Sequence, residues 1–403
     1  MGSGNKSGMT NKDFLSRLRN TCMSVLIIGV LLYIYSINAI FVGTTLGELH
    51  DFGSFIAAGR LAQAGENPYS SDAPLVFNVT FKGISLSGDA PNLNPPISVV
   101  IFKQISNIDP FVSINTWRIV SVLLFVVSVL ILQRVYRKTG SPGVLRIAWA
   151  VALAGFWHTI QLGQLYCFLL LLTVLTYVFL KNKKDIPAGL ILGLLIALKP
   201  NFIFWAFALL AARRWKVFLA AGFTGLLISL IPVITNGFSI YAQWLEASRL
   251  FTPILLLFPG NNSFQGLTAR IGQPQIGIIL GVLLSLAVLW HIYKHRPVDA
   301  AVNALGVSIS LLISPIAWTG YTLLLLPIFF ELKKWNWEYY LSAVIFAVPV
   351  VHVLDNFKTS IAGFTLFGWF YGWGLLVLLG AVIFSSKTFT GKKEESTSKS
   401  QTN

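Results

Sequence analysis

Long apolar runs recur along almost the whole chain, for example "CMSVLIIGVLLYIYSINAIFVG" (Cys22–Gly43) and "SVLLFVVSVLILQ" (Ser121–Gln133). A helix of roughly 20 apolar residues spans the ~30 Å hydrocarbon core of a bilayer. Only 11% of the residues are charged, whereas soluble domains carry roughly 25%. The chain is therefore predicted to be an all-α polytopic membrane protein.

Basic residues lie in short clusters between these runs, and such clusters mark the cytoplasmic side of a membrane protein. We therefore attribute the net charge of +15 to topology and expect no nucleic-acid partner. This rule predicts about twelve transmembrane or half-spanning helices, with both termini cytoplasmic. The predicted spans are Cys22–Gly43, Ser113–Gln133, Leu145–Ile160, Leu165–Leu180, Ile186–Leu198, Phe202–Leu210, Val217–Thr235, Gln275–His291, Ala300–Pro315, Tyr321–Phe330, Tyr339–Val353 and Leu366–Phe384.

The predicted domain plan has three parts. Residues 1–21 form a cytoplasmic N-terminal segment, residues 22–386 form a single transmembrane domain, and residues 387–403 form a disordered cytoplasmic tail. Two segments of the domain, residues 44–112 and 236–274, are expected to lie on the extracytoplasmic side.

The first outer segment contains "LHDFGSFIAAGRLAQAGENPY" (Leu49–Tyr69). Its spacing predicts a short helix that begins at Asp51, presents Phe52, Phe55 and Ile56 on one face, and stops at Gly65. The later stretch "PNLNPPISVVIFKQISNIDP" is too interrupted to cross a membrane, and we expect it to lie in the outer interface beside that helix.

Asp51 is the carboxylate of greatest interest among the chain's 15 Asp and Glu residues. It follows the first predicted span closely, so it is held near the membrane surface on a structured element. Two interpretations stay open. Asp51 is either an ordinary helix cap or a general base.

Lys199 in "LIALKPNF" falls within the membrane on this topology, and Pro200 is expected to break the helix there. A cation at that depth indicates an anionic ligand, unless its stem reaches to the headgroups. Arg270, near a span entrance, serves either a substrate or lipid headgroups. His158 and Gln164 share an outer turn, where His158 also suits a purely interfacial role.

The sequence contains no convincing metal site. Glu48, His50 and Asp51 lie close together, but no further His or Cys is near them in the sequence. P-loop, dinucleotide-binding and nucleophile-elbow motifs are also absent from the sequence. Cys22 and Cys167 both lie in apolar runs and indicate no disulfide framework.

Taken in order, several motifs resemble glycosyltransferase family 87, in the GT-C class of polytopic enzymes that use polyprenyl-phosphate sugars. The resemblance covers most of the chain, although each motif alone is only moderately specific. The motifs are "DFGSFIAAGRLAQAGENPY", "NPPISVVIF", "GQLYCFLLLLTVL", "AGLILGLLIALKPNFIFWAFALLAARRW", "NNSFQGLTARI" and "SPIAWTGYTLLLLP".

The resemblance implies that Asp51 is the catalytic base. It also implies a glycine-glutamine pair at Gly163 and Gln164. The substrate-binding candidates are Lys199, Arg270, His158, Gln164, Asn262, Trp318 and Tyr321. One departure concerns "SPIAWTGY", where similar mannosyltransferases read Ser-Pro-x-Ser-Trp followed by histidines. Tyr321 would have to take over the role of histidine, or that role is missing.

The resemblance implies an inverting transfer of a sugar, expected to be mannose, at the extracytoplasmic face of the plasma membrane. The donor would be a polyprenyl-phosphate sugar and the acceptor a glycolipid or glycan, among membrane lipids, with no metal cofactor. Three alternatives stay open: a transporter or flippase of anionic lipid-linked substrates, a non-catalytic lipid-binding scaffold, and an O-antigen-type ligase or polymerase.

Overall fold

The computed structural model describes residues 50–70, 79–81, 84–86, 92–136, 141–258, 260–350 and 361–384, together with the isolated positions 29, 32, 33 and 36. The predicted N-terminal segment 1–21 and tail 387–403 lie outside the described residues, as does the first span except at those isolated positions.

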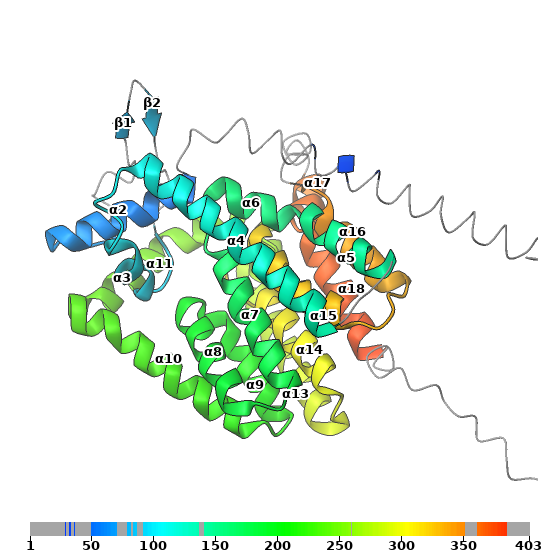
Figure 1. Cartoon of the computed structure of the whole chain (residues 1–403). Helices are drawn as coiled ribbons and strands as arrows, with labels where there is room; N and C mark the ends of the chain where they lie inside the picture. Colours follow the sequence, from blue (N-terminus) through cyan, green and yellow to red (C-terminus); the bar gives the residue numbers. More distant parts are fainter. Residues whose placement is uncertain are drawn as a thin grey trace, which may run out of the picture.

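Helices make up nearly all of the described chain (Figure 1). A short antiparallel hairpin, which pairs Val79 with Leu86 and Phe81 with Ile84, departs from the all-α expectation. In chain order the elements are α2 (His50–Ala64), β1 (Val79–Phe81), β2 (Ile84–Leu86), α3 (Ile97–Lys103), α4 (Pro110–Tyr136), α5 (Ser141–Ala152), α6 (Ala154–Leu162), α7 (Tyr166–Lys181), α8 (Asp185–Leu198), η1 (Pro200–Phe202), α9 (Ile203–Ala211), α10 (Trp215–Asn236), α11 (Ser239–Leu257), α12 (Phe264–Ala269), α13 (Pro274–His295), α14 (Asp299–Leu312), η2 (Thr319–Leu325), α15 (Leu326–Glu331), α16 (Trp337–Ala347), α17 (Ile361–Gly368) and α18 (Phe370–Phe384).

The chain is an integral membrane protein. Among the described residues, four helices are long and apolar enough to cross a bilayer: Pro110–Tyr136, Gly143–Leu162, Trp215–Asn236 and Pro274–His295. Helices also lie at every predicted span after the first, but several are shorter than a full crossing. The count of about twelve crossings therefore stays a prediction.

The long helices α4, α10 and α13 expose apolar side chains along their outer faces, such as Leu130 (59% exposed), Leu226 (62%) and Leu286 (60%). Such faces suit lipid tails, which are as apolar as leucine. In contrast, α14 is buried along its whole length from Ala301 to Leu312. The short helices α7, α8 and α14 thus supply much of the core.

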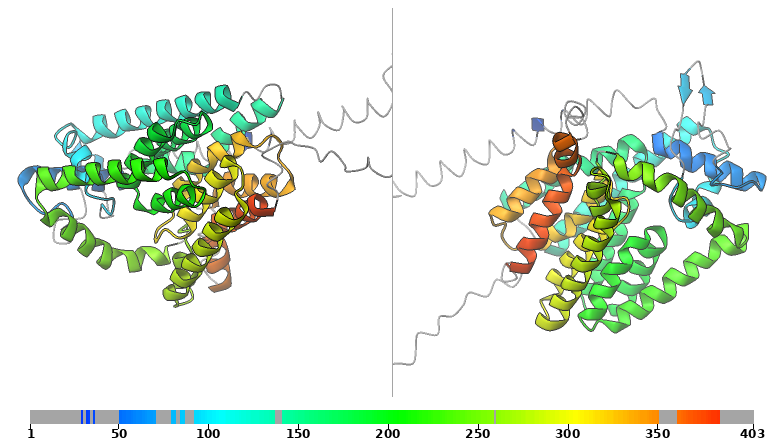
Figure 2. Two further views of the ribbon diagram at one scale, coloured as in Figure 1. Left: turned by 90° about the horizontal axis from the view of Figure 1, so that it is seen from below. Right: turned by 180° about the vertical axis from the view of Figure 1, so that it is seen from behind.

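At one side of the molecule, α2, α3 and α11 lie together (Figures 1 and 2). A separate apolar cluster joins them, with Ala58 and Ala62 from α2, Val99 from α3, and Ile240 and Ala247 from α11. Most of the predicted outer segment 236–274 is therefore helical and packs against the first outer segment.

The predicted apolar face of α2 is confirmed, because Phe52, Phe55 and Ile56 are all buried, and Gly65 follows the helix with a φ of 76°. The following apolar stretch lies beside this helix, as predicted, since a Cβ on Gly59 would lie 2.8 Å from the Phe102 backbone of α3. The position of both helices in the outer interface stays a prediction.

Helix α8 ends at Leu198, as Pro200 predicted, and Lys199 adopts an extended conformation with φ −144° and ψ 91°. The residue before a proline is forced out of the helical region in this way. The helix has 14 residues and is therefore roughly 21 Å long. The break leaves Lys199, which is half-buried, at the end of a helix too short for a complete crossing.

Candidate active site

Asp51 lies inside the first turn of α2, because the helix begins one residue earlier at His50. The helix thus starts one residue before the predicted start at Asp51. The Gln164 Nε2 atom donates a hydrogen bond to Asp51 Oδ2. The carboxylate is half-buried and also benefits from the positive end of the α2 dipole.

Gln164 lies in the turn between α6 and α7, and the conformation of this turn places its side chain next to the Asp51 carboxylate. Gly163 has a left-handed backbone with φ 66°, and a Cβ there would lie 2.6 Å from the Cβ of Phe52. Glycine is needed on both counts. Gln164 itself is buried, and its backbone N–H donates to the Thr159 carbonyl at 3.0 Å.

Lys199 lies at the same end of the helix group. Its Nζ donates to Asn94 Oδ1 at 2.7 Å and lies 5.6 Å from each of the ring centroids of Tyr166 and Tyr321. Both distances are within cation–π range. Asp51 lies close enough for its charge to act on Lys199.

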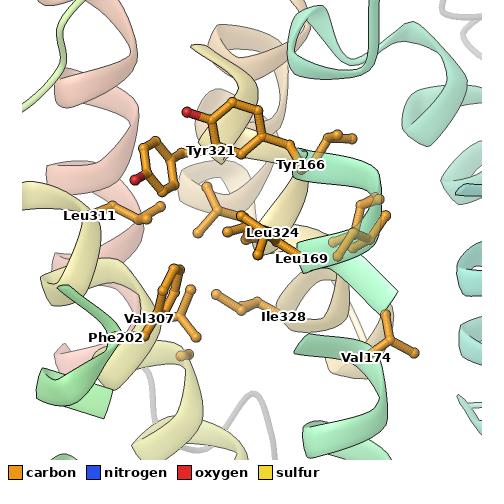
Figure 3. Close-up of a cluster of buried hydrophobic side chains, with 14 of the residues drawn as sticks. Tyr166, Leu169, Val174, Phe202, Val307, Leu311, Tyr321, Leu324 and Ile328 are labelled. Atoms are coloured by element: carbon orange, nitrogen blue, oxygen red, sulfur yellow. The ribbon is translucent and has the colours of Figure 1, made fainter. Parts of the chain in front are cut away.

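Tyr166 and Tyr321 pack against each other, with ring centroids 4.8 Å apart. Gly320 permits this approach, because a Cβ there would lie 2.2 Å from Tyr166 Cδ2. Figure 3 shows the pair at one end of a buried apolar cluster that includes Leu324 and Ile328. Both rings that lie near the Lys199 ammonium therefore belong to the buried apolar cluster.

The side chains of Arg270 and Asn262 are buried and form hydrogen bonds to backbone carbonyls of the loop between α11 and α12. The Arg270 Nη2 atom donates to the carbonyls of Phe258 (2.7 Å) and Asn261 (2.8 Å). Asn262 Nδ2 donates to the carbonyls of Gly260 (2.6 Å) and Ala317 (3.3 Å). Burial lowers the pKa of Arg270 to about 10, so the side chain remains a cation at neutral pH.

His158 and Trp318 lie on elements that build the site. His158 is half-buried on α6, the helix that ends at the Gly163 turn. Trp318 is half-buried just before η2, and its carbonyl accepts a hydrogen bond from the Tyr321 N–H at 3.0 Å. The two elements pack closely, because a Cβ on Gly155 of α6 would lie 2.3 Å from Thr322 Oγ1 of η2.

The sequence candidates that the structure brings together are Asp51 with Gln164, and Lys199 with Tyr321. Sequence reasoning missed Asn94 and Tyr166. Asn94 directly precedes two prolines and an apolar helix, so an unexplained polar residue at that junction was the available signal.

The arrangement combines one carboxylate, oriented by an amide, with a cation held by neutral groups. A carboxylate of this kind accepts a proton, and a fixed cation in a water-poor site stabilises developing negative charge. No cluster of three or more His, Cys, Asp or Glu side chains suited to a metal ion occurs within the described ranges.

The family model described as glycosyltransferase family 87 matches residues 92–315, which is more than half of the 403-residue chain. Alpha-(1->3)-arabinofuranosyltransferase of Corynebacterium glutamicum is 24% identical over 253 residues, which cover 57% of this chain and 59% of that protein. This chain thus spans less than two thirds of that relative.

A second relative is 24% identical over 351 residues, which cover 76% of this chain and 79% of that protein. It is the polyprenol-phosphate-mannose-dependent alpha-(1-2)-phosphatidylinositol mannoside mannosyltransferase of Mycolicibacterium smegmatis. Among solved structures, ArnT from Cupriavidus metallidurans bound to undecaprenyl phosphate gives a TM-score of 0.36 at 13% identity, covering 90% of this chain and 78% of that chain. This structural similarity is low.

Proposed function

Since the chain belongs to glycosyltransferase family 87, we propose that it moves a sugar from a polyprenyl-phosphate donor to a hydroxyl group of a lipid- or glycan-linked acceptor. The anomeric carbon is inverted in one displacement. The observation that carries this proposal is that one turn brings a carboxylate and a cation to the same end of the helix group: Gln164 binds the Asp51 carboxylate, and Tyr166, two residues later, lies beside the Lys199 ammonium.

Asp51 acts as the general base. It accepts the proton of the acceptor hydroxyl while the hydroxyl oxygen forms a bond to the anomeric carbon from the face opposite the phosphate. Gln164 supports this role because its amide N–H donates a hydrogen bond to Oδ2. The hydrogen bond fixes the orientation of the carboxylate without supplying a competing proton.

Lys199 stabilises the leaving group. The bond between the anomeric carbon and the phosphate oxygen breaks, and the polyprenyl phosphate leaves with additional negative charge. A fixed ammonium in a site screened from water interacts with that charge more strongly than it would in bulk water. A phosphate leaving group needs no protonation, so a second carboxylic acid is unnecessary.

The remaining candidates have supporting roles in this proposal. Tyr321, in the place where the resemblance expects a histidine, lines the phosphate site beside Lys199. His158 and Trp318 contact the sugar or the acceptor. Arg270 and Asn262 act chiefly by holding Phe258 and residues 260–262 near the segment that leads to Tyr321.

We further propose that the site faces the extracytoplasmic side and that the architecture is of the GT-C class. Helix α7 runs from Tyr166 at the site to Lys181 at the opposite end. At that opposite end Arg214 Nη1 pairs with Asp299 at 2.8 Å, within a basic region that the positive-inside rule assigns to the cytoplasm.

Mannose is the proposed donor sugar, because the relative that matches over the longer stretch is named for polyprenol-phosphate-mannose. Arabinofuranose is the competing choice, on the name of the other relative. Both sugars therefore belong in the first donor panel.

The test is transfer by the purified protein in nanodiscs, with radiolabelled polyprenyl-phosphate mannose and arabinofuranose as donors and a membrane-lipid extract as acceptor. Asp51→Asn is expected to lose transfer by at least about 100-fold while keeping its melting temperature. Equal rates for the two proteins would exclude Asp51 as the base. Absence of transfer from every donor would favour transport of lipid-linked substrates instead.

A further inference from the structure

Asn94 is held in place from several sides. Asn92 Oδ1 accepts hydrogen bonds from both the backbone N–H and the side-chain amide of Asn94, each at 3.1 Å. Asn92 in turn donates to Ser98 Oγ at 3.2 Å. All three side chains are buried, so their positions are set by protein contacts and not by solvent.

The orientation of the Asn94 amide follows from its two neighbours. Its NH2 group points to an acceptor, the Asn92 oxygen, so its own oxygen is directed to Lys199. An ammonium is a donor only and can bond to no other part of an amide group. The chain from Ser98 through Asn92 therefore aims one acceptor at the Lys199 Nζ.

Asn94 also joins Lys199 to the segment that carries Asp51. The Tyr69 hydroxyl, which lies beyond the end of α2, donates to the Asn94 carbonyl at 2.9 Å. Trp244 of α11 donates to the neighbouring Leu93 carbonyl at 3.0 Å. The position of the cation is thus tied to α2 and α11 through a single short stretch of chain.

The groups described in direct contact with the ammonium are neutral: the amide of Asn94 and the rings of Tyr166 and Tyr321. A carboxylate in place of the amide would hold Lys199 at least as firmly, because hydrogen bonds between ionised groups are stronger. It would also form an ion pair and cancel the charge. The amide therefore holds the cation without neutralising it.

We propose that Asn94 is a positioning residue that keeps the Lys199 ammonium aimed at the phosphate group of a polyprenyl-phosphate substrate and, because the amide is uncharged, forms no ion pair with the ammonium. This inference rests on the proposed function, since it assigns a part in phosphate recognition to a residue that does not itself touch the reacting atoms. Two roles of Asn94 must be distinguished. In the proposed role the amide has to be uncharged, whereas in a merely structural role any side chain that accepts the Lys199 hydrogen bond would serve.

The experiment compares Asn94→Asp, Asn94→Ala and wild type for binding of undecaprenyl monophosphate in nanodiscs and for the donor KM in transfer. We expect Asn94→Ala to weaken phosphate binding by about tenfold, the size of one hydrogen bond to a charged group. Asn94→Asp is expected to weaken it by about 100-fold, and the acceptor KM should stay unchanged.

A merely structural tether predicts the reverse order, because aspartate keeps the oxygen that Lys199 needs while alanine removes it. That order, or wild-type affinity in both variants, overturns the proposal. Thermal unfolding of each variant is measured alongside. If Asn94→Asp does not fold, the test rests on Asn94→Ala, and wild-type affinity of Asn94→Ala for undecaprenyl monophosphate overturns the proposal. Asn115→Asp adds the same charge at an exposed position on α4 and should bind the phosphate as wild type does.

The binding arm separates this inference from the proposed function, because it requires neither a donor sugar nor an acceptor. Weakened phosphate binding in the Asn94 variants, together with no transfer by wild type, overturns glycosyl transfer alone. Transfer by wild type with an unchanged donor KM in Asn94→Asp overturns the role of Asn94 alone.

Discussion

At the scale of single residues, the position of the Asp51 carboxylate depends on Gln164, which lies 113 positions further along the chain. An amide donor suits this task because it stabilises the ionised carboxylate and carries no charge of its own. Gly163 is the local condition for the contact, since its left-handed backbone and its missing side chain let α2 approach the turn.

Replacing Gln164 by glutamate should therefore lower transfer strongly. The new carboxylate keeps the shape of the side chain but repels Asp51 and donates no hydrogen bond at neutral pH, so kcat/KM should fall by about 100-fold. The measurement is steady-state transfer in nanodiscs. Gln63→Glu is the matched control, since Gln63 is exposed on α2, the helix that carries Asp51. A similar loss of kcat/KM in that variant would refute the argument.

At the scale of elements, α8 and α10 pack with their backbones nearly in contact. A Cβ on Gly189 would lie 2.5 Å from the Val217 carbonyl oxygen, and a Cβ on Gly193 would lie 2.5 Å from that of Ala221. Small residues four positions apart commonly form such helix interfaces in membranes. This interface anchors α8, whose end carries Lys199.

Gly193→Ala should lower the melting temperature in detergent, because the added methyl group forces the two helices apart against backbone atoms that cannot rotate away. The expected loss is about 1–3 kcal/mol, and transfer should fall with it as Lys199 shifts. Gly222→Ala on α10 is the control, since a Cβ there meets nothing within 4 Å. A comparable loss in both variants would show that helix propensity, and not packing, sets the stability.

At the scale of the whole molecule, charge is distributed unequally between the two ends of the helix group. The end opposite Lys199 carries an ion-pair network in which Arg214 contacts both Asp185 and Asp299, and Lys183 also contacts Asp299. Such pairs at a surface add little stability individually. Their excess of cations is nevertheless expected to determine the orientation of the protein in the membrane.

Labelling of single cysteines tests this orientation in a background in which Cys22 and Cys167 are replaced by serine. Glu66→Cys, on the exposed turn after α2, should react with a membrane-impermeant maleimide on intact cells. Asn182→Cys, at the exposed turn between α7 and α8, should react only after permeabilisation. The opposite pattern would place the candidate active site on the cytoplasmic side.

Local chemistry was sufficient to predict much of the architecture from the sequence. Apolar runs predicted the helices because burial in lipid demands them, Pro200 predicted the break after α8, and Gly65 predicted the end of α2. Each of these features depends on residues a few positions apart. Helix α2 begins one residue before its predicted start at Asp51, since the limits of a helix depend on how the preceding chain enters it.

By itself, the sequence determined that this chain is a helical membrane protein with one conspicuous carboxylate and one conspicuous lysine. Only the tertiary structure decided their partners, because the contacts of Asp51 with Gln164 and of Lys199 with Asn94 join residues more than 100 positions apart. Helix packing, which no local pattern encodes, sets such distances. The same packing holds Arg270 against loop carbonyls and brings Tyr166 beside Tyr321.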